Sequence, residues 1–343
     1  MRHVQPKRYS VAVTAWVLFG VIVVALAQPA WAQQRHLVLY SGRSKSLVEP
    51  LVEQFTKQTG IDVKARYGKT AALVLALQEE SSSSAADVFW AQDAGALGAV
   101  AKVGLFDRLP HDIIAVVPAT FANPSGYWVA TSGRARVLAY APARVAQTDL
   151  PDTIFNLTDP KWKNRVGWAP TNGSFLAFVT AMRVKHGHKK TRQWLIDMKR
   201  NGTRRYAKNT PILRALAAGE IDLGLSNHYY LLRFKKADKD FPVAQRFFGA
   251  GDIGNLVNVA GTGVLKAGKN RIAARRFVRF LLSPRAQQFF TSQIFEYPVI
   301  EGVIENPRMV KSSELAKRVP DVMLDELSDL AGTRKLLREV GLK

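Results

Sequence analysis

The sequence predicts an α/β fold arranged in two lobes. In the first third of the chain, three strand patterns alternate with two helix patterns across short loops, which is typical of a parallel sheet flanked by helices. The length of 343 residues exceeds that of an average domain, and 47% of the residues are apolar, enough for two medium cores. We therefore expect two lobes, each built on a mixed, mostly parallel sheet with helices on its faces.

The amino terminus has the pattern of a secretory signal peptide over residues 1–32. Basic residues precede an apolar run over 11–27, and the small-residue pattern Ala30-Trp31-Ala32 follows. This pattern predicts cleavage near Ala32 and export to the periplasm. An uncleaved membrane anchor is the alternative, because the apolar run is nearly long enough to span a bilayer.

The chain is strongly basic and lacks cysteine. Its formal net charge is +22, and the leader carries three of these charges, which leaves +19 on the remainder. Such a charge fits nucleic acid, an anionic membrane surface or an acidic ligand. The basic residues are spread out without a nucleic-acid motif, and an export signal precedes them, so we expect no nucleic-acid partner. Without cysteine, any metal must be held by oxygen or nitrogen ligands.

The segment after the leader begins the first lobe. Residues 36–40, 61–65 and 87–90 are apolar or alternate in polarity, as strands do. Between them, apolar residues at helical spacing predict one helix that stops at Gly60 and another that ends near Glu80. This order of elements predicts a βαβαβ unit with parallel strands.

A polar turn follows each of these three strands. The carboxyl ends of parallel strands lie at one edge of a sheet, where ligands bind in open α/β folds. The turns supply the candidate residues of one cleft wall, which are Arg43, Ser44, Gln92 and Asp93. The alternative for each turn is a helix cap or a simple turn without a ligand.

The middle of the chain predicts a crossing strand and a second polar turn. Residues 137–140 have the pattern of a strand that crosses between the lobes, shortly after Arg134. A further strand over 166–170 leads into Thr171-Asn172-Gly173-Ser174, in front of a helix. Small residues at a helix start present backbone N–H groups and hydroxyls to an anion. An ordinary helix N-cap is the alternative for Asn172, Gly173 and Ser174.

The rest of the chain is predicted to be mainly helical. Apolar periodicity and caps predict helices over 175–185, 191–200, 209–218, 270–282 and 284–290. Residues 254–265 have the pattern of a strand pair that returns to the first lobe, and a polar helical tail ends the chain.

The segment from Ala218 to Arg233 carries the strongest candidate site. Alternation over 221–225 predicts a strand, and Ser226 and Asn227 are good N-cap residues, so Tyr229 and Tyr230 fall in the first turn of a helix. At such a junction both hydroxyls can converge on one point. The helix start also favours phenolate over phenol and attracts an anion. Two hard oxygen donors beside an anion site suit a hard cation.

The sequence gives no support for catalysis. It contains no nucleophile elbow, Walker loop, HExxH or GxGxxG motif, and its six histidines show no ligand spacing. No nucleophile, base and orienting group can be assembled into a site. We therefore expect a binding protein rather than an enzyme, with a secreted hydrolase as the remote alternative.

The order of these segments resembles the ferric-iron-binding proteins of bacterial ABC importers, a group of two-lobed periplasmic solute-binding proteins of type II-like fold. The resemblance covers nearly the whole chain after the leader. It rests on six motifs, which are LYSGRS at 39–44, ADVFWAQDAG at 86–95, SGRARVLAY at 132–140, WAPTNGSF at 168–175, NHYY at 227–230 and GDIGNLVNVAGTGVLK at 251–266.

The resemblance implies roles for several residues. It implies that Tyr229 and Tyr230 are the iron ligands and that Arg43 and Arg134 hold a synergistic anion. Other members take a histidine at the position of Ser44, a glutamate at that of Gln92 or a third tyrosine near Ser174, and all three are absent here. We therefore expect carbonate, phosphate or a small chelator to complete the Fe3+ coordination, with Asp93 as an alternative carboxylate ligand.

The resemblance also implies the working cycle. It implies a monomer in which the lobes close on a hinge near 131–137 and 256–262 and then deliver iron to an ABC permease in the inner membrane. We expect a first lobe of 33–133 plus about 260–308, and a second of about 134–259 plus 309–343. The main alternative is a binding protein for a small anion or a metal chelate, with the tyrosines only lining the cleft.

Overall fold

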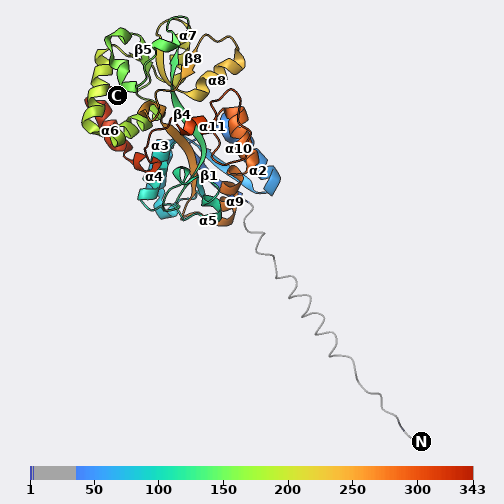
Figure 1. Ribbon diagram of the computed structural model, residues 1–343. Coiled ribbons are helices and arrows are strands. Elements are labelled where there is room, and N and C mark those ends of the chain that lie inside the picture. The colour runs from blue at the N-terminus through green and yellow to red at the C-terminus, as the bar shows by residue number, and fades with distance from the viewer. Residues whose placement is uncertain (2, 4–35, 343) are drawn as a thin grey trace. The chain divides into compact units, whose positions relative to one another are not determined.

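The computed structural model describes residues 1, 3 and 36–342. The predicted signal peptide and its cleavage point near Ala32 lie outside the described residues, apart from Met1 and His3. The body that begins at His36 is one compact unit (Figure 1). No helix within the described range has both the length and the apolar character needed to cross a bilayer.

A single mixed sheet of nine strands runs through this body. The strand order is β2-β1-β3-β9-β4-β7-β5-β6, and β8 pairs with β4 beside this path. The strands are β1 (His36–Ser41), β2 (Asp62–Tyr67), β3 (Val88–Ala91), β4 (Val129–Tyr140), β5 (Val166–Trp168), β6 (Arg204–Arg205), β7 (Leu223–Asn227), β8 (Ala244–Arg246) and β9 (Val257–Val264).

The strand directions are mixed, as expected for each half, although antiparallel pairs are as frequent as parallel ones. β1 lies parallel to both β2 and β3, and β5 lies parallel to both β6 and β7. The long strands β4 and β9 run antiparallel to their neighbours. Every residue of β4 is buried, because helices and loops cover both faces of the sheet at its centre.

Helices pack on both faces of the sheet. They are α2 (Lys45–Thr59), α3 (Thr70–Glu80), α4 (Ala94–Lys102), α5 (His111–Ile114), α6 (Gly173–Arg200), α7 (Asn209–Ala217), α8 (His228–Ala237), α9 (Arg271–Leu281), α10 (Pro284–Phe289), α11 (Ser312–Ala316) and α12 (Leu330–Glu339). The aromatic rings of Phe55 and Trp90 meet Phe277 edge to face, at centroid distances of 5.0 and 6.1 Å, in the core beneath β1 and β3. Such pairs stabilise beyond their buried area.

The strand β4 belongs to both halves of the molecule. Its first part, Val129 to Ala135, pairs with β9, and its second part, Arg136 to Tyr140, pairs with β7. Figure 1 shows β4 running from the part that contains β1 to the part that contains β5 and β8. The crossing strand predicted over 137–140 is therefore confirmed, and β4, with 12 residues, is three times as long as predicted. One continuous strand therefore connects the two lobes.

Two predictions for the middle and later parts of the chain have different outcomes. The two helices expected over 175–185 and 191–200 are confirmed, because α6 consists of two helical segments that meet at Gly187, whose backbone is non-helical with φ at 79°, a conformation that favours glycine. The strand pair expected over 254–265 is wrong, since a short 3₁₀ turn capped by Asp252 leads into the single strand β9.

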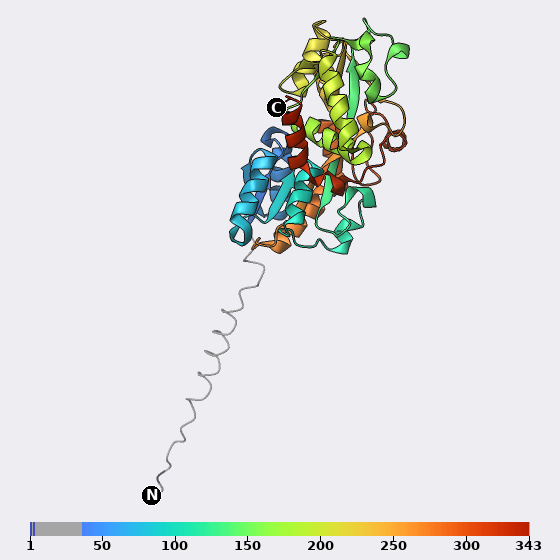
Figure 2. The ribbon, with the colours of Figure 1, turned by 90° about the vertical axis from the view of Figure 1, so that its left-hand side faces the viewer.

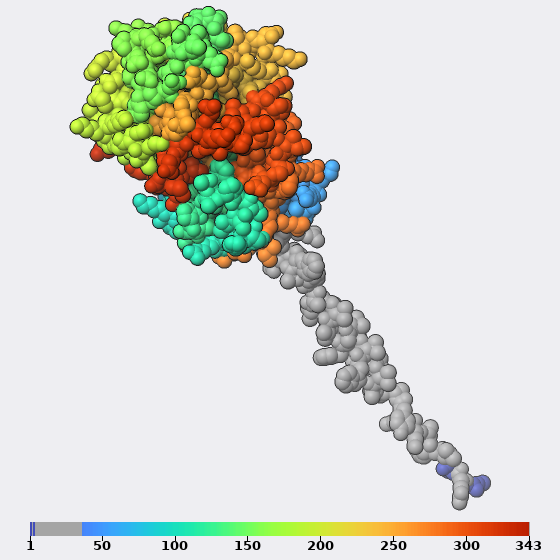
Figure 3. Space-filling view, in the orientation of Figure 1, coloured from blue at the N-terminus to red at the C-terminus, as the bar shows by residue number. Residues whose placement is uncertain are grey.

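The C-terminal tail packs against both halves. A 3₁₀ turn at Leu324–Ser328 contacts α4, and α12 lies beside α6 (Figure 2). The hydroxyls of Thr180 and Thr333 are 2.8 Å apart, and Arg183 pairs with Asp329 at 2.9 Å. Figure 3 shows the orange and red C-terminal residues crossing the face between the green and yellow part and the cyan part. The tail is thus a structural bridge rather than a solvated extension.

Candidate functional site

The three turns after β1, β2 and β3 lie at one edge of the sheet, as the parallel topology predicts. The backbone N–H of Gly42 donates to Trp90 at 2.8 Å, and that of Gly68 donates to Ser41 at 3.1 Å. These bonds bring the turns side by side. Gly42, Lys69, Gln92 and Asp93 then line one wall of a cleft.

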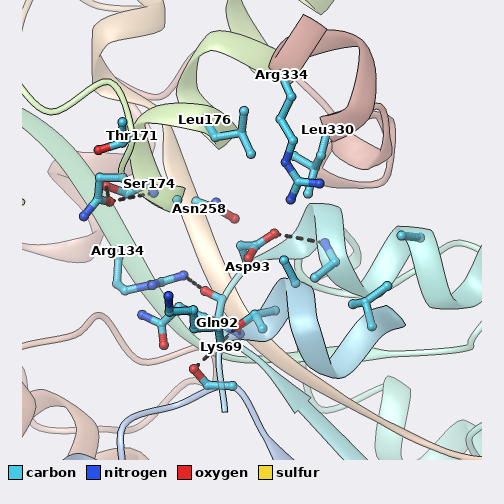
Figure 4. Close-up of a pocket in the computed structure, with 18 of the residues that line it drawn as sticks. Lys69, Gln92, Asp93, Arg134, Thr171, Ser174, Leu176, Asn258, Leu330 and Arg334 are labelled. Atoms are coloured by element: carbon cyan, nitrogen blue, oxygen red, sulfur yellow. Dashed lines mark hydrogen bonds between the residues drawn. The ribbon is translucent and has the colours of Figure 1, made fainter. Parts of the chain in front are cut away.

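The cleft has a volume of about 620 Å³ and collects most of the predicted site residues (Figure 4). Those that line it are Gln92, Asp93, Arg134, Asn172, Gly173, Ser174, Asn227, Tyr229 and Tyr230. They come from the ends of β3 and β7, the middle of β4 and the starts of α6 and α8. Residues far apart in the sequence therefore face a common space, whereas Arg43 and Ser44 do not line it.

Arg43 lies beneath the cleft wall in an ion pair. Its guanidinium donates to the Glu296 carboxylate at 2.9 Å and to the side-chain oxygen of Gln92 at 3.0 Å, and its side chain is fully buried. Glu296 also accepts from the Ser132 hydroxyl. Arg43 therefore already has an internal counter-charge, and its role in holding an anion stays a prediction. Ser44 is exposed at the start of α2 and faces solvent instead.

The two tyrosines stand in the first turn of α8, as the sequence predicts. Asn227 is extended, the helix begins at His228, and the rings of Tyr229 and Tyr230 lie 4.3 Å apart at an angle of 32°. Burial raises the pKa of the Tyr229 phenol, with Tyr230 adding to the effect and Arg134 opposing it. The expected preference of the helix start for phenolate is thus outweighed by burial.

His228 anchors the start of α8 to two neighbouring segments through its ring nitrogens. Its Nδ1 accepts from the N–H of Ala135 at 3.1 Å, and its Nε2 lies 2.7 Å from the carbonyl oxygen of Phe295. Burial lowers the pKa of His228 to about 4, so the ring is neutral and its Nε2–H donates to that carbonyl. The imidazole therefore ties the tyrosine-bearing helix to β4 and to the loop before Glu296.

The Thr171 to Ser174 turn is both a helix cap and part of the cleft. The side-chain oxygen of Asn172 accepts from the Ser174 N–H at 2.9 Å, which makes Asn172 the N-cap of α6. A Cβ added at Gly173 would meet no atom within 4 Å, so the space in front of the helix start is open. The Ser174, Phe175 and Leu176 N–H groups all donate to Asn172, so this helix start offers an anion the Gly173 N–H and the positive end of the helix dipole.

Arg134 and Arg136 project from the same face of β4 into the cleft. The Arg134 guanidinium donates to the backbone oxygen of Gln92 (Figure 4). Arg136 was not among the site residues predicted from the sequence. It could have been, because residues two positions apart on a strand share a face and Arg134 was predicted. Asn258 and Arg334 also line the cleft and were not predicted, whereas Lys69 belongs to the turn after β2 that was expected at this edge.

Asp93 is held in place as a helix cap. Its carboxylate accepts from the N–H of Ala96 at 2.9 Å at the start of α4. Burial raises its pKa, against the opposing charges of Arg134 and Arg334. Across the described residues, no three or more His, Cys, Asp or Glu side chains gather in a way that could hold a metal. The paired phenols are therefore the best hard-cation donors that the cleft offers.

Comparison with known proteins gives the family. Residues 50–317 match the bacterial extracellular solute-binding proteins. The major ferric iron-binding protein of Neisseria meningitidis serogroup B is 33% identical over 336 residues, which covers 95% of this chain and 99% of that protein. The match thus extends over nearly the whole of both chains.

Solved structures agree with this match. The iron-bound HitA of Pseudomonas aeruginosa superposes with a TM-score of 0.84 at 34% identity, covering 90% of this chain and 99% of that chain. A Trichodesmium protein in complex with iron and citrate ligands gives a TM-score of 0.79 at 29% identity, covering 90% of this chain and all of that chain. With its two-lobed α/β fold, the chain belongs to the bacterial extracellular solute-binding proteins.

Proposed function

We propose that this chain captures ferric iron outside the cytoplasm and passes it to an ABC permease in the inner membrane. The observation that carries the proposal is the pair of phenols, Tyr229 and Tyr230, which share the first turn of α8 and line the cleft with adjacent, tilted rings. Phenolate oxygens are hard donors that match a small, highly charged cation. The ferric iron-binding relatives and the iron-bound neighbour support the same cargo.

Capture requires both phenols to lose a proton. Unperturbed phenols ionise near pH 10, and burial shifts Tyr229 further upward, so the cation itself must displace the protons. Two phenolates leave Fe3+ with uncompensated charge. An anion such as carbonate or phosphate then completes the coordination, held by Arg134, by Asn172 and by the N–H groups at the start of α6.

In this proposal, release of iron and its delivery to the permease depend on movement of the two lobes about a hinge. The two crossings near 131–137 and 256–262 are the places where the lobes change their angle, with 33–133 plus about 260–308 on one side and about 134–259 plus 309–343 on the other. The neutral His228 and the Arg43–Glu296 pair hold the local geometry on both sides of the crossing. A monomer that is exported to the periplasm fits this cycle.

The test is the colour of the iron complex. Protein purified with Fe3+ and bicarbonate is expected to show a visible phenolate-to-iron charge-transfer band, which Tyr229→Phe and Tyr230→Phe each weaken or abolish. Tyr206→Phe is the matched control, because Tyr206 does not line the cleft and its hydroxyl donates to Glu220 instead. A colourless wild-type protein without iron affinity would overturn the iron assignment.

One second function has a specific observation in its favour. The charged residues of the cleft wall are mostly cationic, which also suits a small anion or a preformed chelate, with the tyrosines only lining the cleft. In that case iron binding would persist in both Tyr→Phe variants, or would be absent while anions bind. Turnover of an ester or glycoside would instead indicate the remote hydrolase alternative.

A further inference from the structure

Iron capture does not account for the strong positive charge of the chain. The formal net charge is +22, of which the leader carries three. Ferric iron is itself a cation, so a positive field does not help to attract it. Eight of the cationic residues gather on one surface at the end of the lobe that contains β1, together with exposed aliphatic side chains. This combination indicates a partner other than iron.

The helix α9 presents arginine side chains to the solvent. Its inward residues, which include Phe277 and Leu281, are buried in the core. Its outward residues follow helical spacing and therefore share one face, and they are Arg271, Ile272, Arg275, Arg276 and Arg279. Ile272 is 72% exposed among these four arginines, and α9 contains no acidic residue. The outward face of α9 is thus both cationic and partly apolar.

Two neighbouring segments extend this face. The guanidinium of Arg271 donates to the carbonyl oxygen of Lys266 at 2.9 Å, and the N–H of Lys266 donates to the carbonyl oxygen of Leu105 at 2.9 Å. These contacts join α9 to the loop after β9 and to the chain after α4. We call the combined area the basal surface, which consists of the outward face of α9 with Lys102, Val103, Arg108, Lys266 and Lys269.

The charge of the basal surface is only partly compensated. Asp107 pairs with Arg271 and Arg275 at 3.7 and 3.2 Å, and Asp112 pairs with Arg279 at 2.8 Å. Eight cations therefore face two carboxylates. Five of the cations form no salt bridge within residues 36–342, and they are Lys102, Arg108, Lys266, Lys269 and Arg276. An excess of positive charge thus remains exposed beside Ile272.

The basal surface lies at the end of its lobe that is remote from the cleft. The Asp87 carboxylate accepts from the N–H of Val38, near the start of β1, and from that of Asn270, just before α9, both at 2.8 Å. β1 and β3 run from this point to the cleft, where the turns after them form part of its wall. Figure 1 shows α5 and α9 at the end of the body opposite α7 and β8. A partner on the basal surface therefore leaves the cleft free.

We propose that the basal surface docks on a bilayer of anionic phospholipids. Cationic side chains are attracted by the negative headgroups of such a bilayer, and aliphatic side chains among them enter its interface. Ile272 and Val103, which are 72% and 52% exposed, supply the aliphatic part. An acidic protein surface would match the charge equally, and vesicles of pure lipid separate the two partners. This inference goes beyond the proposed function, because docking requires no iron.

Vesicle sedimentation tests the docking. The exported chain is mixed with vesicles of phosphatidylcholine alone and with vesicles that also contain phosphatidylglycerol, at low and at high salt. The test variant combines Lys269→Glu with Arg276→Glu, which are exposed and form no salt bridge in the described chain, so the fold is retained. The matched control combines Lys189→Glu with Arg192→Glu, which makes the same change of net charge on exposed positions of α6. A thermal melt of each variant checks the fold.

The expected result is selective binding to the anionic vesicles. Wild-type protein should bind them, should not bind phosphatidylcholine alone, and should be released at high salt. The variant of the basal surface should bind roughly tenfold more weakly or less, because each cation near an anionic bilayer adds to the affinity. The control should stay within about twofold of wild type, since charges beyond the screening length contribute little. Ile272→Ser should weaken binding severalfold and keep the salt dependence.

Three outcomes would overturn the docking. Equal loss in the control pair would mean that the net charge of the whole chain attracts the bilayer, and absence of binding to the anionic vesicles would exclude lipid as the partner. Binding that requires permease in the membrane would assign the basal surface to a protein.

The docking and the proposed iron capture fail separately. None of the substituted residues lines the cleft, so the iron charge-transfer band should be unchanged in every one of these variants. Tyr229→Phe and Tyr230→Phe should in turn leave vesicle binding unchanged, because neither residue belongs to the basal surface.

Discussion

The carboxylate of Glu296 lies 2.9 Å from the guanidinium of Arg43, although 253 residues separate them in the sequence. Arg43 follows β1, and Glu296 follows the helical turn after α10. Ser132 on β4 donates to the same carboxylate. The pair thus joins the first strand, the crossing strand and the chain near Tyr297, directly beneath the cleft wall. Its geometry supports the cleft without contributing a residue to the lining.

Breaking this pair is expected to destabilise the protein strongly. Glu296→Ala leaves Arg43 buried without a counter-charge, and loss of one partner of a buried pair costs about 3–5 kcal/mol. Urea unfolding of the variant measures the cost. The control Glu314→Ala removes an exposed pair with Lys317 and should leave the urea midpoint nearly unchanged, because water screens such pairs. Equal effects of the two variants would contradict the structural role of Glu296.

The same pair predicts a pH dependence. Burial acts to raise the pKa of Glu296, but Arg43, Arg134 and the Ser132 hydroxyl together hold it below its usual value of 4.5. A carboxyl whose pKa is lower in the folded state stabilises the fold above its unfolded pKa, and this stability is lost as pH falls. We therefore expect the wild-type free energy of unfolding to drop below about pH 4.5 more steeply than that of Glu296→Gln. Parallel curves for the two proteins would exclude this linkage.

Iron affinity is expected to rise with pH between 7 and 8. Burial holds the pKa of Tyr229 above its ordinary value, and an iron ion that both tyrosines bind as phenolates displaces two phenol protons. With citrate, whose carboxylates are ionised in this range, the logarithm of the apparent affinity should increase by about two per pH unit. A pH indicator in weak buffer counts the released protons. A slope near one would mean that only one tyrosine binds as phenolate.

The tyrosine site was predictable from the sequence because it depends on neighbours in the chain. Strand alternation before Asn227 and helix spacing after it place Tyr229 and Tyr230 in one helical turn, and the structure has that turn. The start of α6 at Asn172 was predictable for the same reason. Local patterns carry this information because each helix begins where its capping residues lie.

The charge partners were not predictable, because they come from distant segments. Nothing near Arg43 indicates that Glu296 neutralises it, and nothing near Arg334 indicates that the C-terminal helix reaches the cleft. Burial raises the pKa of Tyr229, and the extent of burial depends on Phe295 and Leu232, which pack around its ring. Tertiary contacts of this kind decide whether Arg43 or Arg334 is free to bind an anion.

Gly173→Ala is expected to separate stability from binding. The added methyl group meets no atom within 4 Å, and alanine is preferred to glycine in a helix by roughly 0.5–1 kcal/mol, so the melting temperature should rise slightly. The same methyl group extends into the space where an anion approaches the helix start. Iron binding in the presence of bicarbonate should therefore weaken. An unchanged affinity would show that the anion does not use this helix start.

Asn172→Ala tests whether the start of α6 serves the cleft as well as the helix. The substitution removes the side-chain oxygen that accepts from Ser174, and loss of such a cap costs about 1 kcal/mol. The matched control is Ser283→Ala, which removes the cap of α10 away from the cleft, where the Ser283 hydroxyl accepts from Ala286. Both variants should lose similar stability in urea unfolding.

Only Asn172→Ala should also weaken anion-dependent iron binding. Without this cap the first turn of α6 frays, and the N–H groups of that turn no longer hold a fixed position beside the cleft. Titration of each variant with iron, with and without bicarbonate, measures the difference. If both variants bind iron equally well, the cap of α6 has a structural role alone, and the anion must be held by the arginines of β4 and α12. That outcome would move the anion site from the helix start to Arg134, Arg136 and Arg334, which line the cleft and form no salt bridge within the described part of the chain.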